Sequence, residues 1–181
     1  MGCGKSSVGK ILATLLPECR LIDLDTYIEE KRGLTIPEIF NEYGEAAFRR
    51  MERETLEEIF RDPDRPRAIL SLGGGTVTTE ECRRLIRQHT DCFYLRATTG
   101  TLLANLEGHS EGRPMLNPTQ PVEASSTEVP SEREALRRRI ESLMQTRSPQ
   151  YLATAHHIID INGHTAAQIA AQIAAQIAAQ I

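Results

Sequence analysis

The chain opens with the letters MGCGKSS, and several of these residues suit the binding of phosphate groups. Gly2 and Gly4 let backbone N–H groups approach a phosphate closely, and Lys5 supplies a positive charge for the terminal phosphates. The Ser6 hydroxyl is an oxygen ligand of the kind that Mg²⁺ accepts. A helix from Ser7 onward would add the positive end of its dipole. The segment therefore predicts a site for nucleotide phosphates; the alternative is a Gly-Lys-Ser turn that arises by chance.

Two acidic residues, Asp23 and Asp25, lie in the stretch RLIDLD. The stretch predicts a short buried strand, and residues two apart on a strand lie on the same side. Both carboxylates could therefore face one crevice. Near bound phosphates, one carboxylate can hold the water molecules of a metal ion, and a second can orient or deprotonate an attacking hydroxyl. The alternative is a pair of solvated charges at a strand end.

Three consecutive glycines, Gly73, Gly74 and Gly75, follow the apolar run RAILSL. The run predicts a strand, and open α/β sheets bind their ligands at the carboxyl ends of strands. Because glycine has no side chain, the backbone there can approach a small polar molecule closely. The glycines therefore favour a ligand pocket over a merely flexible turn.

Three arginines complete the candidate set: Arg49, Arg113 and Arg147. Taken singly, each would most often be a solvated surface residue. As a set, together with the acids and the glycines, they become candidate ligand-binding residues.

The elements that must position these residues alternate between strand and helix. Four strands are predicted by RLIDLD, by RAILSL, by CFYL and by HHIIDI, and helical apolar spacing fills the segments between them. One helix begins at a capping box at Thr35 and is interrupted near Gly44. Another runs from Glu132 to Met144, and Pro149 restarts it. The pattern indicates one α/β domain, residues 1–181, with a parallel sheet that helices cover on both faces.

The composition excludes several classes of protein. A net charge of −4 over 181 residues provides no basic field for nucleic acid or for an anionic membrane surface. The four cysteines form no C-x-x-C pair, so neither a zinc site nor a disulfide framework is predicted. No apolar stretch approaches the roughly 18 residues of a membrane span. We therefore expect a cytoplasmic monomer that binds neither nucleic acid nor membranes.

Two segments differ from this pattern. Residues 117–132 are rich in Pro, Ser, Thr and Glu, which predicts a mobile surface loop. The tail from about 165 to 181 repeats AAQI and predicts a helix. Its isoleucines recur every four residues and therefore advance by about 40° per repeat, so the later repeats should be partly exposed.

Seven motifs together resemble the shikimate kinase family. In chain order they are GCGKSSVGK, LIDLDTYIEE, GLTIPEIFNEYGEAAFRRME, LSLGGGTVTT, FYLRA, GRPML and RSPQY. The resemblance runs from residue 1 to about 161, and several motifs are specific to this family, whereas small P-loop kinases in general share only the first. It implies the three-layer P-loop NTPase fold and transfer of the γ-phosphate of ATP to the 3-hydroxyl of shikimate.

The resemblance also implies a role for each candidate residue. By this resemblance, the nucleotide is bound by Gly2, Cys3, Gly4, Lys5, Ser6, Ser7 and Arg113. Shikimate is bound by Asp25, Arg49, Gly73, Gly74, Gly75 and Arg147. Of these, the two arginines bind the carboxylate of shikimate. Ser6 would ligate Mg²⁺ and Asp23 would orient its water shell. Lys5, Asp25 as the candidate base and Arg113 in a lid would be the catalytic residues.

The chain departs from the family pattern near the lid, which we place at about residues 105–132. Many members carry an arginine shortly before the lid, but Leu106 and its neighbours offer none, and the insertion after Leu116 is long. Two alternatives to a shikimate kinase also stay open. One is another P-loop small-molecule kinase of the gluconate type. The other, raised by the repetitive tail and by the strand missing at the start of the chain, is an inactive protein that binds shikimate or nucleotide.

The start of the chain is a further departure. The full phosphate-loop pattern is G-x-x-x-x-G-K-[ST], and its first glycine would fall ahead of Met1. Family members place a central apolar strand before this loop, so we expect the natural protein to begin further upstream. If Met1 is the true start, the sheet lacks that strand. Its neighbours then keep unpaired backbone groups, and the chain should be unstable or inactive.

Overall fold

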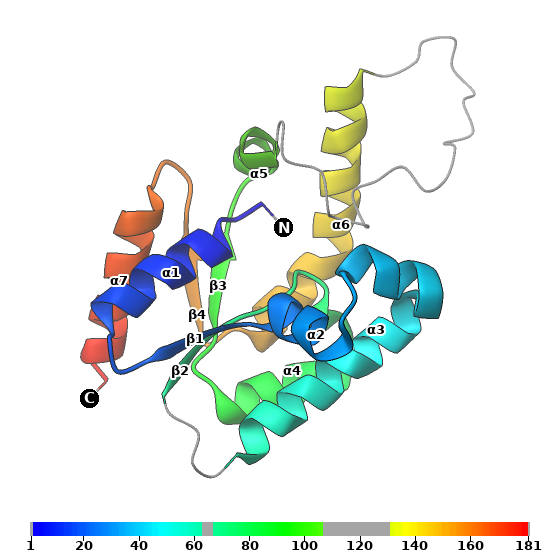
Figure 1. The fold of residues 1–181 in the computed structure, drawn as a ribbon. Helices are drawn as coiled ribbons and strands as arrows, with labels where there is room; N and C mark the ends of the chain where they lie inside the picture. The colour runs from blue at the N-terminus through cyan, green and yellow to red at the C-terminus, as the bar shows by residue number, and fades with distance from the viewer. Residues whose placement is uncertain (1, 63–66, 107–130, 181) are drawn as a thin grey trace.

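A computed structural model describes residues 2–62, 67–106 and 131–180. The elements are α1 (Lys5–Leu15), β1 (Arg20–Asp23), α2 (Leu24–Arg32), α3 (Ile36–Arg61), β2 (Ala68–Ser71), the 3₁₀ turn η1 (Thr76–Thr78), α4 (Glu80–His89), β3 (Phe93–Arg96), α5 (Thr99–Leu106), α6 (Glu132–Thr154), β4 (His157–Asp160) and α7 (Ala166–Ala178) (Figure 1).

The four strands form two parallel pairs. β1 pairs with β2, from Arg20 opposite Ala68 to Asp23 opposite Ser71. β3 pairs with β4, from Phe93 opposite His157 to Arg96 opposite Asp160. Within the described residues no ladder joins β2 to β3, so the sheet is divided into two halves. The predicted α/β class with parallel strands and flanking helices is confirmed.

Helices pack on both sides of the strands (Figure 1). On one side α1 and α7 pack with β4 through Val8, Leu12, Ile159, Ile161, Ile169, Ala170 and Ile173. On the other side α2, α3 and α4 share a core of Leu24, Ile28, Ile39, Phe48, Leu56, Ile59, Cys82 and Ile86, with Val77 of η1. A smaller cluster joins α5 to α6. Burial of these side chains supplies the main stabilisation, about 25 cal/mol per Å² of apolar surface.

Two local predictions were wrong. Asp25 does not lie on an extended strand, because β1 ends at Asp23 and α2 begins at Leu24. Pro149 lies inside the continuous helix α6 and does not restart it. A proline inside a helix removes one N–H bond and crowds the carbonyl four residues earlier, and packing of the helix against neighbouring elements can compensate for this cost. The interruption near Gly44 is confirmed, since its φ of 77° and ψ of 169° are not helical.

The C-terminal repeats form α7, which ends at Ala178. Its Thr165 N-cap accepts a bond from the Gln168 N–H, and the Gln168 side chain in turn accepts one from the Thr165 N–H. Ile169 and Ile173 are buried, whereas Ile177 is only partly buried. Across the described part of the chain, no helix combines the length and the apolar character that crossing a membrane requires.

Candidate active site

The N-terminal loop needs its glycines for steric reasons. Gly4, the N-cap of α1, has φ 73°, and Gly2 has φ 63°, a region that residues with side chains rarely adopt. A Cβ at Gly2 would also lie 2.8 Å from a side-chain carbon of Leu106. Helix α1 begins at Lys5, two residues earlier than predicted. Lys5, Ser6 and Ser7 therefore form its first turn, where N–H groups lack intrahelical partners and favour an anion.

Ser6 of this loop forms a side-chain hydrogen bond with Asp23. The Ser6 hydroxyl donates to Asp23 Oδ2 at 3.2 Å, and Asp23 Oδ1 accepts from the Asp25 N–H at 3.2 Å. The second bond caps α2 and fixes the Asp23 carboxylate toward Ser6. A hydroxyl and a carboxylate oxygen fit the hard-oxygen preference of Mg²⁺. Among the described residues no group of three or more His, Cys, Asp or Glu side chains could hold a metal ion.

Asp25 lies in the first turn of α2 and contacts the glycine turn that follows β2. A Cβ built on Gly73 would lie 2.7 Å from Asp25 Oδ1, so only glycine leaves room for the carboxylate. Burial raises the pKa of Asp25; the nearby Lys5 ammonium acts against this shift, and the Asp23 carboxylate adds to it. The aspartate thus lies between the loop and the turn in a partly desolvated position.

Arg49 is held by two acids of its own helix, α3. Its Nη1 donates to Glu52 Oε2 at 2.6 Å, and its Nη2 donates to Glu45 Oε1 at 2.8 Å. Glu52 has no exposed surface, and its Oε1 accepts from Thr76 Oγ1 at 2.5 Å. Burial raises the pKa of Glu52, and the Arg49 charge and the Thr76 bond oppose that rise. Arg49 presses so closely on Gly75 that a Cβ there would overlap the guanidinium.

Arg147 reaches the same turn from α6. It is 8% exposed, and its Nη1 donates to the Gly74 carbonyl at 3.3 Å. The Tyr151 hydroxyl, one helical turn further on, donates to the same carbonyl at 2.6 Å. Burial raises the pKa of Tyr151, so its hydroxyl keeps the proton that it donates. The glycine turn is thereby tied to α6.

The structure therefore gathers most of the predicted site residues around one turn. Asp25 contacts Gly73, Arg147 bonds Gly74 and Arg49 contacts Gly75. Lys5 lines the same cavity as Gly73 and Gly74. Arg113, the predicted lid arginine, and most of the predicted 105–132 lid lie outside the described residues.

Four residues of this network were not predicted: Glu45, Glu52, Thr76 and Tyr151. Glu52 stands three positions after Arg49, the spacing at which helical side chains meet, but many other charges in α3 share that spacing. Thr76 directly follows the glycines and Tyr151 follows Arg147 by four residues, so proximity to predicted site residues was the only available signal.

Known protein families and solved structures resemble this chain over most of its length. The family model described as shikimate kinase matches residues 1–178. The shikimate kinase of Chlorobaculum tepidum is 38% identical over 151 residues, which cover 83% of this chain and 73% of that protein. The chain belongs to the shikimate kinase family. The shikimate kinase of Thermus thermophilus is 34% identical over 169 residues, covering 93% of this chain and 81% of its own length.

Solved shikimate kinases share the fold. The enzyme from Acinetobacter baumannii, in complex with shikimate, superposes with a TM-score of 0.82 at 32% identity, covering 99% of this chain and 89% of that one. The enzyme from Bacteroides thetaiotaomicron gives a TM-score of 0.81 at 25% identity, covering 98% and 93%. A kinase of this family uses ATP as its phosphate donor.

Proposed function

We propose that this protein transfers the γ-phosphate of ATP to the 3-hydroxyl of shikimate and so forms shikimate 3-phosphate and ADP. The carrying observation is the convergence of Asp25, Arg49 and Arg147 on one glycine turn beside the Lys5 loop. A carboxylate and two guanidinium groups match a ligand that has hydroxyls on one side and a carboxylate on the other. Such a reaction depends on positioning and electrostatics.

Asp25 would receive the proton of the substrate hydroxyl. Its carboxylate is partly desolvated, and desolvation raises its pKa and so its affinity for a proton. Lys5, which lowers the pKa of Asp25 from nearby, would at the same time bind the terminal phosphates of ATP. Together the two residues would bring the acceptor oxygen and the phosphate into line.

Arg49 and Arg147 would bind the carboxylate of shikimate from two helices. Their forked N–H groups suit a planar carboxylate, and neighbouring acids and carbonyls already hold both guanidinium groups. Such preorganisation lowers the entropy lost when the substrate binds. The lack of side chains at Gly73 and Gly75 leaves the room in which Asp25 and Arg49 approach the turn.

Ser6 and Asp23 would hold Mg²⁺ together with the ATP phosphates, and the ion would neutralise charge that develops on the transferring group. Gly2, Cys3, Gly4, Lys5 and Ser7 would hold the phosphates, and Arg113 would close over them. We also propose that the enzyme acts as a monomer in the cytoplasm.

A coupled assay of ADP release tests the proposal. With ATP and Mg²⁺ we expect turnover on shikimate and none above background on gluconate, since a gluconate-type kinase has no need for the Arg49, Arg147 and glycine set. Turnover on gluconate but not on shikimate would show that the proposed substrate is wrong and that the protein is a gluconate-type kinase. If calorimetry shows that shikimate binds but no ADP forms under any condition, the protein is a binding protein.

A further inference from the structure

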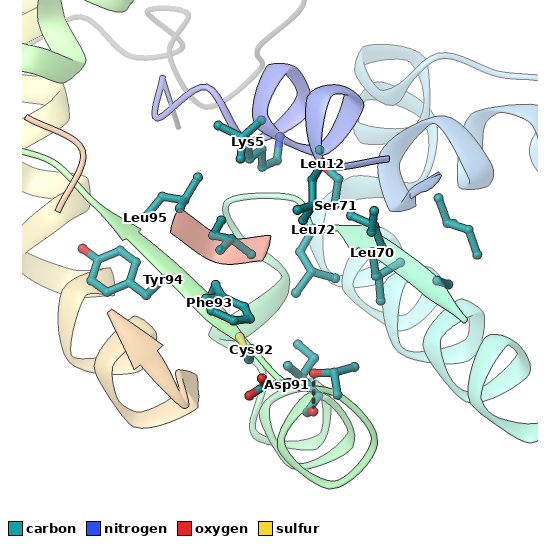
Figure 2. Close-up of a pocket in the computed structure, with 18 of the residues that line it drawn as sticks. Lys5, Leu12, Leu70, Ser71, Leu72, Asp91, Cys92, Phe93, Tyr94 and Leu95 are labelled. Carbon is teal, nitrogen blue, oxygen red and sulfur yellow. Dashed lines mark hydrogen bonds between the residues drawn. The ribbon is translucent and has the colours of Figure 1, made fainter. Parts of the chain in front are cut away.

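Tyr151 of α6 lies where the glycine turn comes close to β3. It lines the cavity of about 800 Å³ between β2 and β3, as do Gly74 and Tyr94. Figure 2 shows the Tyr94 and Phe93 rings on opposite sides of β3. The centroids of the Tyr94 and Tyr151 rings lie 5.1 Å apart, and the two rings are tilted by 32°. This aromatic contact restricts where the Tyr151 hydroxyl can point.

The Tyr151 hydroxyl lies together with a carbonyl of the turn and a guanidinium of its own helix. It donates to the Gly74 carbonyl at 2.6 Å, and Arg147 Nη1 donates to the same carbonyl at 3.3 Å. Burial raises the pKa of Tyr151, and the Arg147 guanidinium beside the hydroxyl opposes this rise. The carbonyl therefore takes its short bond from the neutral tyrosine and only a long one from the charged arginine.

The long bond leaves most of the donor capacity of Arg147 unused. Its 3.3 Å length exceeds the usual range of about 2.7–3.2 Å for an N–H donor. Arg49 pairs with two carboxylates, whereas Arg147 pairs with none among the described residues. Arg147 is nevertheless only 8% exposed, and a buried charge without a counter-charge is costly. A ligand carboxylate would supply that counter-charge.

The bond from Tyr151 also fixes one peptide unit of the turn. Because a peptide unit is planar and trans, the Gly74 carbonyl and the Gly75 N–H point in opposite directions. With the carbonyl held toward α6, the Gly75 N–H points away from α6. Gly75 lies against the Arg49 guanidinium, so a rotation of this peptide would disturb Arg49 as well.

The elements on both sides of this bond are held independently of it by two arginines of α4. Arg87 Nη1 donates to the Ala153 carbonyl at 2.9 Å and to the Ala155 carbonyl at 3.2 Å, at the end of α6. Arg83 Nη1 donates to the Val77 carbonyl of η1, just after the turn, at 2.8 Å. Loss of the Tyr151 hydroxyl would therefore release the turn locally and leave α6 and η1 in place.

We propose that Tyr151 is a positioning residue for the substrate carboxylate: its hydroxyl holds the Gly74 carbonyl and thereby leaves Arg147 free to bind that carboxylate. Without the hydroxyl, the carbonyl would accept only from Arg147. That charge-assisted bond would shorten and draw the guanidinium toward the turn. The inference rests on the proposed function and deepens it, because Tyr151 acts through Gly74 and Arg147 rather than by contact with the reacting atoms.

Calorimetric titration with shikimate, in the absence of ATP, tests the proposal on the full chain. Tyr151→Phe removes the hydroxyl and keeps the ring. We expect Kd for shikimate to rise by about tenfold, and KM for shikimate by a similar factor, while KM for ATP and kcat change by less than about threefold. Tyr94→Phe removes a hydroxyl from the neighbouring ring and is the matched control, which should leave Kd within about twofold.

A double-variant cycle shows whether the hydroxyl acts through Arg147. Arg147→Lys keeps the positive charge but loses the planar fork, so it should weaken shikimate binding by itself. If Tyr151 positions Arg147, then Tyr151→Phe should raise Kd by less than about threefold in the Arg147→Lys chain. A hydroxyl that serves only the stability of the fold would cost the same factor in both chains, and that result would overturn the proposal.

Two further results would overturn it: normal binding of shikimate by Tyr151→Phe, or equal losses of affinity for shikimate and for ADP. Equal losses, or a Tyr151→Phe chain that does not fold, would assign the hydroxyl to general stability. If the parent chain does not bind shikimate, the proposed function fails together with this inference. If both the parent and Tyr151→Phe bind shikimate equally well, only the positioning role is rejected.

Discussion

The glycine turn and the cavity between β2 and β3 share Gly73 and Gly74 but differ in how their polar groups are satisfied. Around the turn, buried charges and hydroxyls bond one another: Glu52 holds both Arg49 and Thr76. Along the cavity, among the described residues, no ladder joins β2 to β3 and Ser71 Oγ has no hydrogen-bond partner. Side-chain contacts therefore hold the glycine turn together, although among the described residues no ladder joins β2 to β3.

Asp25→Asn tests the catalytic half of this comparison and should have the largest effect. The amide cannot accept the hydroxyl proton, so we expect kcat to fall by roughly 100-fold to 10,000-fold. The measurement is the coupled assay of ADP release. Glu30→Gln, an exposed change on the same helix, is the control and should leave kcat within about twofold. An Asp25→Asn enzyme with a normal rate would remove the base assignment.

Glu52→Gln breaks the network at its buried centre. Arg49 loses its closest charge partner while remaining largely buried, and we expect a loss of about 3 kcal/mol in the free energy of unfolding. Urea denaturation measures this loss, and KM for shikimate should rise because Arg49 is released. Glu54→Gln, at a half-exposed position of the same helix, should change stability by less than about 0.5 kcal/mol. Equal stability of the two variants would contradict the assigned network.

A pair of hydroxyl deletions compares the two regions directly. Thr76→Val removes the donor to buried Glu52 and should cost about 1–3 kcal/mol in unfolding free energy. Ser71→Ala removes a buried hydroxyl that bonds nothing and should be neutral or stabilising by up to about 1 kcal/mol. The same urea experiment measures both. A reversed order would show that the cavity is better satisfied than the turn.

The pH dependence of stability should show the smallest effect. Burial raises the folded pKa of Asp25 above its ordinary value of 3.8, so between these two values the folded state binds more protons than the unfolded state. Stability from this group is therefore fully present at lower pH and is lost as pH rises through the folded pKa. Relative to the parent chain, Asp25→Asn should gain stability as the pH rises from 3.8 through the raised folded pKa, in paired urea titrations; a constant difference would contradict the shift.

Sequence patterns predicted the secondary structure well where the signal was local. Capping boxes, apolar periodicity and glycines gave the helix at Thr35, the four strands and the interruption at Gly44. They failed at Asp25 and at Pro149, where neighbouring elements decide whether a strand ends or a helix continues. The resemblance to shikimate kinases, carried by motifs along the chain, located most of the candidate site.

The sequence by itself determined which chemical groups are present: a loop suited to phosphates, paired acids, a glycine turn and arginines. Each of these is encoded within a few residues. What only the tertiary structure decided is which distant groups meet. Glu52 became the buried partner of Arg49 and Thr76, and β2 and β3 came to border one cavity. The reason is physical, because burial and pairing depend on the packing of segments far apart in the chain, and no local pattern records that packing.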